Sequence, residues 1–344
     1  MLAAQLFGIR DLRLSDLPSP PAPGPGEVQV AVRAVGICGS DLHYYLAGSM
    51  GDASCIFPLI LGHEPAGQVL RVGLGVSGVE PGDMAALEPA ICCGRCEFCL
   101  TGHQNVCERI RFLSNPGEPG FFREIVNLPA ENVMPLPPGL SAEEATLYEP
   151  LAVALNAMKF AAIRPGESAA VFGAGPIGLL TIAAARLSGA GRIYAVDRVP
   201  ARLELARRMG ADCAIDFSAT EPDRAIWNDT GRRGVDVTFE AAGKAEAVNH
   251  CLRVTRNAGR VVLIGIPSSV TVALEFHEMR RKELALFNVR RQNRNAHTAL
   301  QLLAERRIAF GEIVTHTRPL SAIQSAFRLL EAYDDGVGKA VIAA

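Results

Sequence analysis

Residues 167–197 read ESAAVFGAGPIGLLTIAAARLSGAGRIYAVD, and this stretch decides the fold. An apolar run leads into a glycine-rich turn, a helical pattern and a second apolar run that ends at Asp197. Alternation of strand, helix and strand predicts a parallel sheet. Similar units follow up to about residue 290, as in GVDVTFEAAG and GRVVLIGIP. We therefore expect residues 152–290 to form a doubly wound α/β domain.

The turn carries the pattern G-x-G-x-x-G at Gly173, Gly175 and Gly178. Between a strand and a helix, this pattern is typical of a Rossmann dinucleotide site. Asp197, 19 residues after Gly178, is placed to accept hydrogen bonds from a ribose and to repel a 2′-phosphate, which favours NAD over NADP. The neighbouring Arg198 keeps NADP open, because an arginine can accommodate that phosphate. The residues expected to contact the cofactor are Gly173, Gly175, Pro176, Ile177, Gly178, Asp197, Arg198 and Arg202.

The first ~150 residues have a different pattern. Short β-like runs such as EVQVAVRAVGI alternate with turn signals such as VEPGD, which predicts a β-rich domain. After residue 290 the chain adds two amphipathic helical patterns and the apolar run GKAVIAA. We expect a β-rich domain made of residues 1–151 and 291–344, with the α/β domain inserted between its two parts.

Composition excludes several classes of protein. Of 344 residues, 49% are hydrophobic and 20% are charged, and the net charge is −2. This balance is ordinary for a globular protein and indicates neither a nucleic-acid nor a membrane partner. No apolar run is long enough to cross a bilayer, and the N-terminus lacks the apolar core of a signal peptide. We therefore expect a cytoplasmic protein with reduced thiols.

Five of the nine cysteines lie in CCGRCEFCLTGHQNVC, residues 92–107. In a reducing compartment such a cluster more often binds metal than forms disulfides. Four thiolates on one loop can close a tetrahedron around zinc and leave no open position, so the predicted zinc is structural. Its expected ligands are Cys93, Cys96, Cys99 and Cys107, which leaves Cys92 as a surplus cysteine.

Two further segments carry potential metal ligands. GICGSDLH contains Cys38, Ser40 and His43, and LGHEPAGQV contains His63 and Glu64. Together with the cysteine loop and the glycine motif, in this order and over nearly the whole chain, they make the sequence resemble zinc-dependent medium-chain alcohol and polyol dehydrogenases. The resemblance implies a GroES-like fold for the β-rich domain and a cleft between the domains for the substrate.

The resemblance also implies a catalytic zinc bound by Cys38 and His63. Many alcohol dehydrogenases supply a second cysteine, but here YEPLAVALN places Glu149 at that point, as in the sorbitol, xylitol and threonine dehydrogenase branch. Neighbouring residues in a regular strand point to opposite faces, so His63 and Glu64 reach one zinc only if the backbone bends. The expected ligand set is Cys38, His63, Glu64 and Glu149, and which glutamate is the third ligand stays open.

By the same resemblance, Ser40 takes the proton of the substrate alcohol and passes it through the nicotinamide ribose to His43. Tyr44 after His43, and Glu88 followed by Pro89, favour a polyol dehydrogenase of the sorbitol or xylitol type. The candidate substrate residues are Tyr44, Phe121, Glu149 and Arg290, with Phe122 as a second apolar wall.

Arg291 stands where the family usually has tyrosine, and a second guanidinium is equally suited to a sugar acid. The alternatives are thus a sugar-acid or L-threonine dehydrogenase on the same scaffold, and a non-catalytic NAD-binding protein. The expected cofactors are NAD and about two zinc ions per chain. The expected partners are a small polyol and further copies of the chain, as a tetramer or a dimer.

Overall fold

The computed structural model describes every residue from Met1 to Ala344. Contacts within the chain define two compact units. Unit 1 comprises Met1–Glu149, Ala296–Arg307 and Val314–Ala344, and unit 2 comprises Pro150–Asn295 and Ile308–Ile313. The predicted domains, residues 1–151 with 291–344 and residues 152–290, are functional domains and stay predictions, because the two units are defined by contacts alone.

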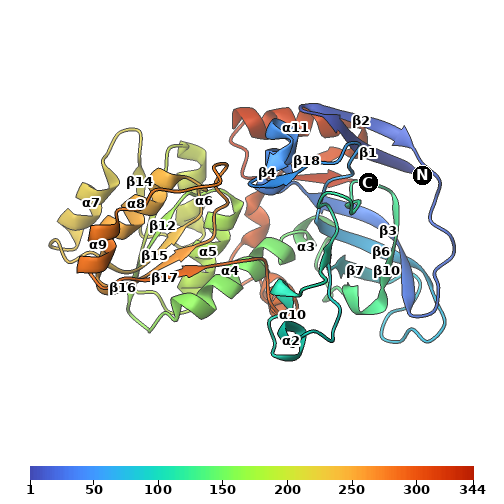
Figure 1. The fold of residues 1–344 in the computed structure, drawn as a ribbon, viewed down its shortest axis with the longest axis horizontal. Coiled ribbons are helices and arrows are strands. Elements are labelled where there is room, and N and C mark those ends of the chain that lie inside the picture. Colours follow the sequence, from blue (N-terminus) through green and yellow to red (C-terminus); the bar gives the residue numbers. More distant parts are fainter. The chain divides into compact units, whose positions relative to one another are not determined.

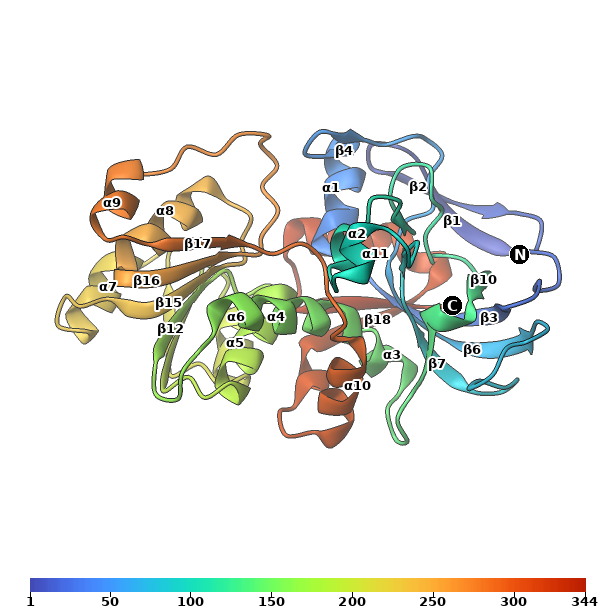
Figure 2. The same cartoon turned by 60° about the horizontal axis from the view of Figure 1, so that its bottom comes forward.

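Unit 1 is built on a mainly antiparallel sheet of seven strands in the order β11-β7-β6-β3-β19-β18, with β10 also paired to β3. Figure 2 shows β3, β6 and β7 side by side. The C-terminal strand β19 pairs with β3, so the end of the chain completes the β-rich unit as expected. The strands are β3 (Glu27–Gly36), β6 (Glu64–Val72), β7 (Met84–Leu87), β10 (Ile125–Pro129), β11 (Val133–Pro135), β18 (Val314–Pro319) and β19 (Lys339–Ala343).

A hairpin and several helices accompany this sheet. Helix α11 packs against β2, β18 and β19, because its apolar residues Ile323, Phe327 and Leu330 recur on one face. The ring of Phe327 packs against Tyr45 in a tilted arrangement and against Phe122 edge to face in the core. The elements are β1 (Leu2–Gly8), β2 (Asp11–Asp16), α1 (Gly39–Ala47), β4 (Ser49–Met50), β5 (Ala53–Ser54), β8 (Ala90–Ile91), α2 (Glu97–Leu100), β9 (Arg111–Phe112), α3 (Ala142–Ala145), α10 (Ala296–Glu305) and α11 (Ile323–Ala332).

Unit 2 contains the predicted parallel sheet, with six strands in the order β14-β13-β12-β15-β16-β17. The order reverses at β12, as in a doubly wound fold, and this reversal is the usual place for a ligand. All six residues of β15 are buried, as expected of a central strand covered on both faces. The strands are β12 (Ser168–Phe172), β13 (Arg192–Asp197), β14 (Cys213–Asp216), β15 (Val235–Glu240), β16 (Thr255–Leu263) and β17 (Ala285–Asn288).

Helices connect the strands of unit 2 (Figure 1). Helix α5 packs against β12 and β13, and α8 packs against β15 and β16. Ile226 of α7 and Leu252 of α8 join Phe172 and Val261 of the sheet in one hydrophobic core. The helices are α4 (Tyr148–Ala161), α5 (Pro176–Leu187), α6 (Pro200–Arg208), α7 (Pro222–Asp229), α8 (Ala245–Val254) and α9 (Phe276–Arg281).

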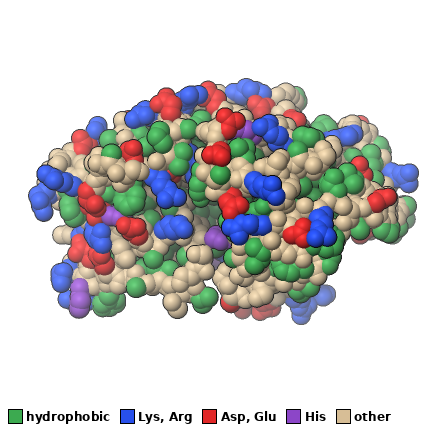
Figure 3. Space-filling view, turned by 90° about the horizontal axis from the view of Figure 1, so that it is seen from above, with side chains coloured by type: hydrophobic (Ala, Val, Ile, Leu, Met, Phe, Trp, Pro, Cys, Tyr) green, Lys and Arg blue, Asp and Glu red, His purple; other side chains and the backbone are tan.

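The surface carries both signs of charge. Figure 3 shows basic and acidic side chains interspersed on the face in view, in line with the net charge of −2. None of the helices combines the length and the apolar character that crossing a bilayer requires.

Candidate active site and metal centres

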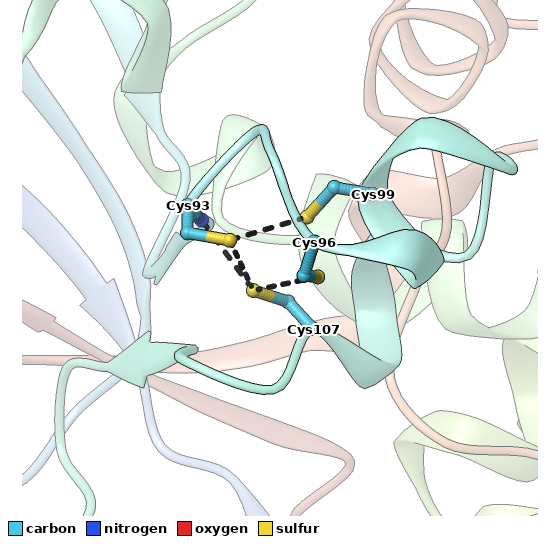
Figure 4. A group of neighbouring side chains, drawn as sticks. All are labelled: Cys93, Cys96, Cys99 and Cys107. Atoms are coloured by element: carbon cyan, nitrogen blue, oxygen red, sulfur yellow. Dashed lines mark hydrogen bonds between the residues drawn. The ribbon is translucent and has the colours of Figure 1, made fainter.

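The four cysteines predicted to bind structural zinc converge on one point (Figure 4). Cys96 is the N-cap of the short helix α2, and Cys99 lies within that helix. The sulfur atoms of Cys93 and Cys99 are 4.0 Å apart, and those of Cys93 and Cys107 are 3.5 Å apart. Cys96 and Cys107 are separated by 3.9 Å.

These distances fit a zinc ion. Four sulfurs at about 2.3 Å from a central zinc stand about 3.8 Å from one another in a tetrahedron. All nine cysteines are free, so the cluster is not a set of disulfides. Backbone hydrogen bonds, chiefly from Arg95, lower the pKa of Cys93 to about 6, whereas burial raises the pKa of Cys99 to about 12. A bound cation would remove this conflict, because it stabilises all four thiolates together.

A second group of metal-binding side chains lies in unit 1. The ligand atoms of Cys38, His63 and Glu64 all lie within 4.8 Å of one another. Cys38 is the N-cap of α1, and Glu64 is the first residue of β6. The backbone bend that the two neighbours His63 and Glu64 require is present, because Gly62 adopts a left-handed conformation with φ 90° just before β6.

Asp41 organises this group and was missed in the sequence, although it lies inside GICGSDLH. It is buried, and one of its carboxylate oxygens lies 3.3 Å from His63 Nδ1. The same oxygen accepts hydrogen bonds from the backbone of Gly62 and the hydroxyl of Ser114. Burial acts to lower the pKa of His63, but Asp41 and Cys38 outweigh it and raise that pKa well above its usual value. Asp41 therefore orients the imidazole so that Nε2 remains for a metal.

Glu64 has a partner that sequence reasoning also missed. The buried ammonium group of Lys339, on β19, forms an ion pair with the buried carboxylate of Glu64. The pairing of β3 with both β6 and β19 brings Glu64 and Lys339 together. Gly36 on β3 lies opposite Glu64 of β6 and also opposite Val341 of β19. A side chain at Gly36 would overlap both charged groups. The lysine in the apolar run KAVIA was the sequence signal that could have predicted a buried ion pair, because lysine is rarely buried without a partner.

Glu149 lies outside the group of three ligand atoms. It stands in the first turn of α4, where it is 5% exposed. Burial, helped by the nearby carboxylates of Glu64 and Glu88, raises the pKa of Glu149 to about 8. The structure thus places Glu64 in direct reach of the other ligands and Glu149 in their electrostatic neighbourhood.

The donor set fits zinc. Sulfur, imidazole and carboxylate are the ligands zinc takes in proteins, and three protein ligands are typical of a catalytic site. Ser40 lies beside the group, with its hydroxyl 3.3 Å from His63 Nε2. His43 is half-buried on the same helix, three residues further along, where i and i+3 share a face.

The predicted dinucleotide residues lie at the carboxyl end of β12 and the start of α5 in unit 2. Gly173 has φ 99°, and a side chain there would meet the backbone of Ala242. Gly175 is the N-cap of α5, and Pro176 is the first residue of that helix. A side chain at Gly178 would overlap the carbonyl of Gly173. The turn therefore leaves the free N–H groups of the helix accessible, which suits a pyrophosphate.

Asp197 ends β13 beside this turn. Its carboxylate accepts hydrogen bonds from the N–H groups of Ala174, Arg198 and Val199, at 2.7 to 2.9 Å. A carboxylate has about four acceptor positions, so one remains for a ribose hydroxyl. Ile177 is half-buried in α5, and Arg198 is exposed. The guanidinium of Arg202 lies close to Gly175.

The candidate substrate residues are distributed unevenly. Tyr44 is buried on α1, the helix that carries Ser40. Phe121 and Phe122 are at most 1% exposed and belong to the hydrophobic core of unit 1, and their role as walls of a substrate pocket stays a prediction. Arg290 is exposed and follows β17 in unit 2. Phe112, which the sequence did not single out, has its ring centroid 5.4 Å from that of His63.

Comparison with known proteins agrees with this geometry. Residues 24–138 match the alcohol dehydrogenase GroES-like domain, and residues 176–305 match the zinc-binding dehydrogenase domain. Sorbitol dehydrogenase of Bacillus subtilis is 36% identical over 326 residues, which are 95% of this chain and 92% of that protein. The chain belongs to the zinc-binding alcohol dehydrogenase family. The predicted fold class, a GroES-like unit with a Rossmann unit, is confirmed.

Solved structures of the family superpose on nearly the whole chain. An alcohol dehydrogenase from Escherichia coli CFT073, solved with NADH, is 27% identical, with a TM-score of 0.90 over 100% of this chain and 99% of that chain. L-Idonate 5-dehydrogenase of Escherichia coli K-12 is 28% identical, with a TM-score of 0.90 over 100% and 98%. The family thus includes enzymes named for a polyol and for a sugar acid.

Replacing Asp197 tests the predicted ribose contact. We expect Asp197→Ala to raise the KM for NAD about tenfold to a hundredfold, because a charge-assisted hydrogen bond is lost. The KM for NADP should rise less or fall, because the repulsive carboxylate is gone. Damage to the turn alone would weaken the binding of NAD and NADP equally. A change in the ratio of kcat/KM for NAD to kcat/KM for NADP therefore indicates loss of the ribose contact. Glu204→Gln, an exposed carboxylate on α6, is the control.

Proposed function

We propose that this protein oxidises a secondary alcohol of a polyol of the sorbitol or xylitol type to a ketose, with NAD as hydride acceptor. The observation that carries the proposal is the convergence of Cys38, His63 and Glu64 in a chain that matches a sorbitol dehydrogenase over 95% of its length. The dinucleotide turn of unit 2 and the NADH-bound relative support the cofactor.

Cys38, His63 and Glu64 would hold the catalytic zinc, which supplies a Lewis acid that lowers the pKa of an alcohol, while NAD supplies the hydride acceptor. Asp41 holds His63 by its Nδ1 and so fixes the ring orientation. Lys339 balances the negative charge of Glu64, because an unpaired carboxylate in this buried environment would destabilise the fold. Cys93, Cys96, Cys99 and Cys107 would hold the structural zinc.

Ser40 is proposed to accept the proton of the substrate alcohol, since its hydroxyl lies next to His63, one of the three proposed zinc ligands. His43 would receive this proton and release it to solvent, because imidazole titrates near neutral pH. Glu149, whose pKa burial raises to about 8, is proposed to alternate with Glu64 as the third protein ligand of the zinc as substrate enters. Tyr44 and Arg290 are proposed to contact the substrate.

A sugar acid is the second candidate substrate. The resemblance to L-idonate 5-dehydrogenase favours it, and so does the second guanidinium that Arg291 adds next to Arg290. A non-catalytic NAD-binding protein is disfavoured, because it would not need the metal ligands Cys38, His63 and Glu64. It would not need Asp41 and Lys339 to support them either.

A substrate panel separates these functions. We expect NADH absorbance to rise when sorbitol or xylitol is supplied with NAD, with kcat/KM at least about tenfold above that for gluconate-type acids or L-threonine. Turnover of the acids alone would establish the second candidate. About two zincs per chain fit the two enzymes, whereas one zinc per chain together with no turnover of any alcohol in the panel would favour the non-catalytic alternative.

The assembly and the compartment are part of the proposal. Strand β17 is an edge strand of the sheet in unit 2, and the unpaired backbone groups of an edge strand can pair with another chain. We propose a homo-oligomer, a tetramer or a dimer, with no nucleic-acid or membrane partner. Nine free cysteines support a reducing, cytoplasmic location.

A further inference from the structure

A cavity of about 200 Å³ lies in unit 2 away from the dinucleotide turn. Its lining includes Arg233, which precedes β15, and Arg256, near the start of β16. The cavity therefore lies at the amino-terminal edge of the parallel sheet, whereas the turn after β12 lies at the carboxyl-terminal edge. No residue proposed for catalysis or cofactor binding lines it.

Five of the nine residues that line the cavity are cationic. Some of these charges are balanced locally. Lys282 pairs with Glu278 at 2.8 Å and donates hydrogen bonds to carbonyls at the end of α8. Arg253 is held by Glu275 and Asp223. These two cations stabilise the helix ends and are already compensated.

The other three cations have a single carboxylate among them. Arg233 and Arg256 share Asp236, at 2.7 and 2.6 Å. The Arg232 side chain has no carboxylate partner and lies over the ring of Trp227, 5.8 Å from its centroid. Counted over all five cations, the carboxylates of Asp223, Asp236, Glu275 and Glu278 leave a surplus of positive charge beside the cavity, and Arg232, Arg233 and Arg256 are the least compensated.

We propose that this cavity is a binding site for a phosphate group, either inorganic phosphate or a phosphomonoester. A phosphate carries about −1.5 to −2 charges at neutral pH, and a surplus of positive charge attracts it. Guanidinium groups bind phosphate through paired N–H donors. A cavity of this volume holds about half a dozen waters, enough room for a tetrahedral oxyanion with a small attached group. The Trp227 ring holds the Arg232 guanidinium by a cation–π contact.

Isothermal titration calorimetry with inorganic phosphate tests the site. The holoenzyme is titrated with NAD at saturation, so that the dinucleotide turn is filled, and at constant ionic strength, because general screening would otherwise contribute. We expect saturable binding of about one phosphate per chain. Arg232→Gln and Arg256→Gln should each weaken the affinity about tenfold or more, since each removes a charged donor.

The two substitutions are chosen to preserve the fold. Arg232 is exposed and has no ion pair to break, and Asp236 keeps Arg233 and Ser168 as partners when Arg256 is lost. Arg318→Gln, an exposed arginine in unit 1, is the matched control and should leave the affinity unchanged. The proposal is overturned if phosphate does not bind the holoenzyme, or if all three variants bind it as tightly as the unmodified protein. Titration with glucose 6-phosphate then distinguishes a phosphomonoester site from one that takes only inorganic phosphate.

Discussion

Cys38→Ser is expected to lower kcat by about three orders of magnitude or more and to leave NADH binding unchanged. A serine hydroxyl stays protonated and is a poor zinc ligand, so the variant loses the metal that stabilises charge on the substrate oxygen. Such stabilisation contributes several kcal/mol to the barrier, and each 1.4 kcal/mol corresponds to about tenfold in rate. The measurements are kcat from NADH absorbance, NADH affinity from fluorescence, and zinc content, which should fall by about one per chain.

The substitution should leave the fold intact. The N–H of Cys38, not its thiol, donates the hydrogen bond to Asp41 that begins α1, at 3.0 Å. Cys55→Ser is a matched control, because Cys55 is a free, half-buried cysteine of unit 1 outside both clusters. If the Cys38 variant retained full turnover, the proposed catalytic centre would be wrong. A control variant with the same loss would instead indicate general damage to unit 1.

Sequence reasoning performed well where a function depends on residues close together in the chain. The four cysteines lie within fifteen positions, from 93 to 107, so their spacing alone predicted their convergence. The glycine turn is equally local, since Gly173 and Gly178 belong to one strand–helix junction. In both cases short-range geometry leaves few alternatives.

The supporting residues were harder to predict, because strand pairing brings them together from distant parts of the chain. Lys339 meets Glu64 only because β19 pairs with β3, and β3 pairs with β6. Asp41 could be read as an ordinary residue of the first turn of α1, where carboxylates are common. Its contact with His63 depends on the bend at Gly62, which no local pattern specified.

Phe121 is a candidate substrate residue whose role stays a prediction. The stretch NPGEPGFF supplied Phe121 and Phe122 as candidate apolar walls of a substrate pocket. In the structure Phe121 hydrogen-bonds through its backbone to Gly62, and its ring is buried in the core. An aromatic side chain in a loop more often stabilises the loop by burial than binds a ligand.

Cys96→Ser is expected to lower thermal stability much more than it lowers kcat. The proposed structural zinc closes the loop of residues 92–107, and three thiolates bind the ion more weakly than four. Metal binding at such a site contributes directly to folding free energy, and a loss on the order of 3 kcal/mol corresponds to a fall in Tm of roughly 4 to 7 °C for a chain of this size. The measurements are Tm at one fixed scan rate, zinc content, and kcat well below the transition.

Cys92→Ser separates zinc binding from the general effect of losing a thiol in this loop. Cys92 is adjacent to Cys93, but its sulfur lies 3.4 Å from the Gln104 carbonyl oxygen and outside the group of four. Its substitution should therefore leave zinc content and Tm nearly unchanged. An equal fall in Tm for both variants would show that packing, not the metal, stabilises the loop. If the Cys96 variant unfolded at the same temperature as the unmodified protein, the proposed structural zinc would be wrong. A zinc ion that stabilises this loop through four thiolates must stabilise it less when one thiolate is lost, and Tm must then fall.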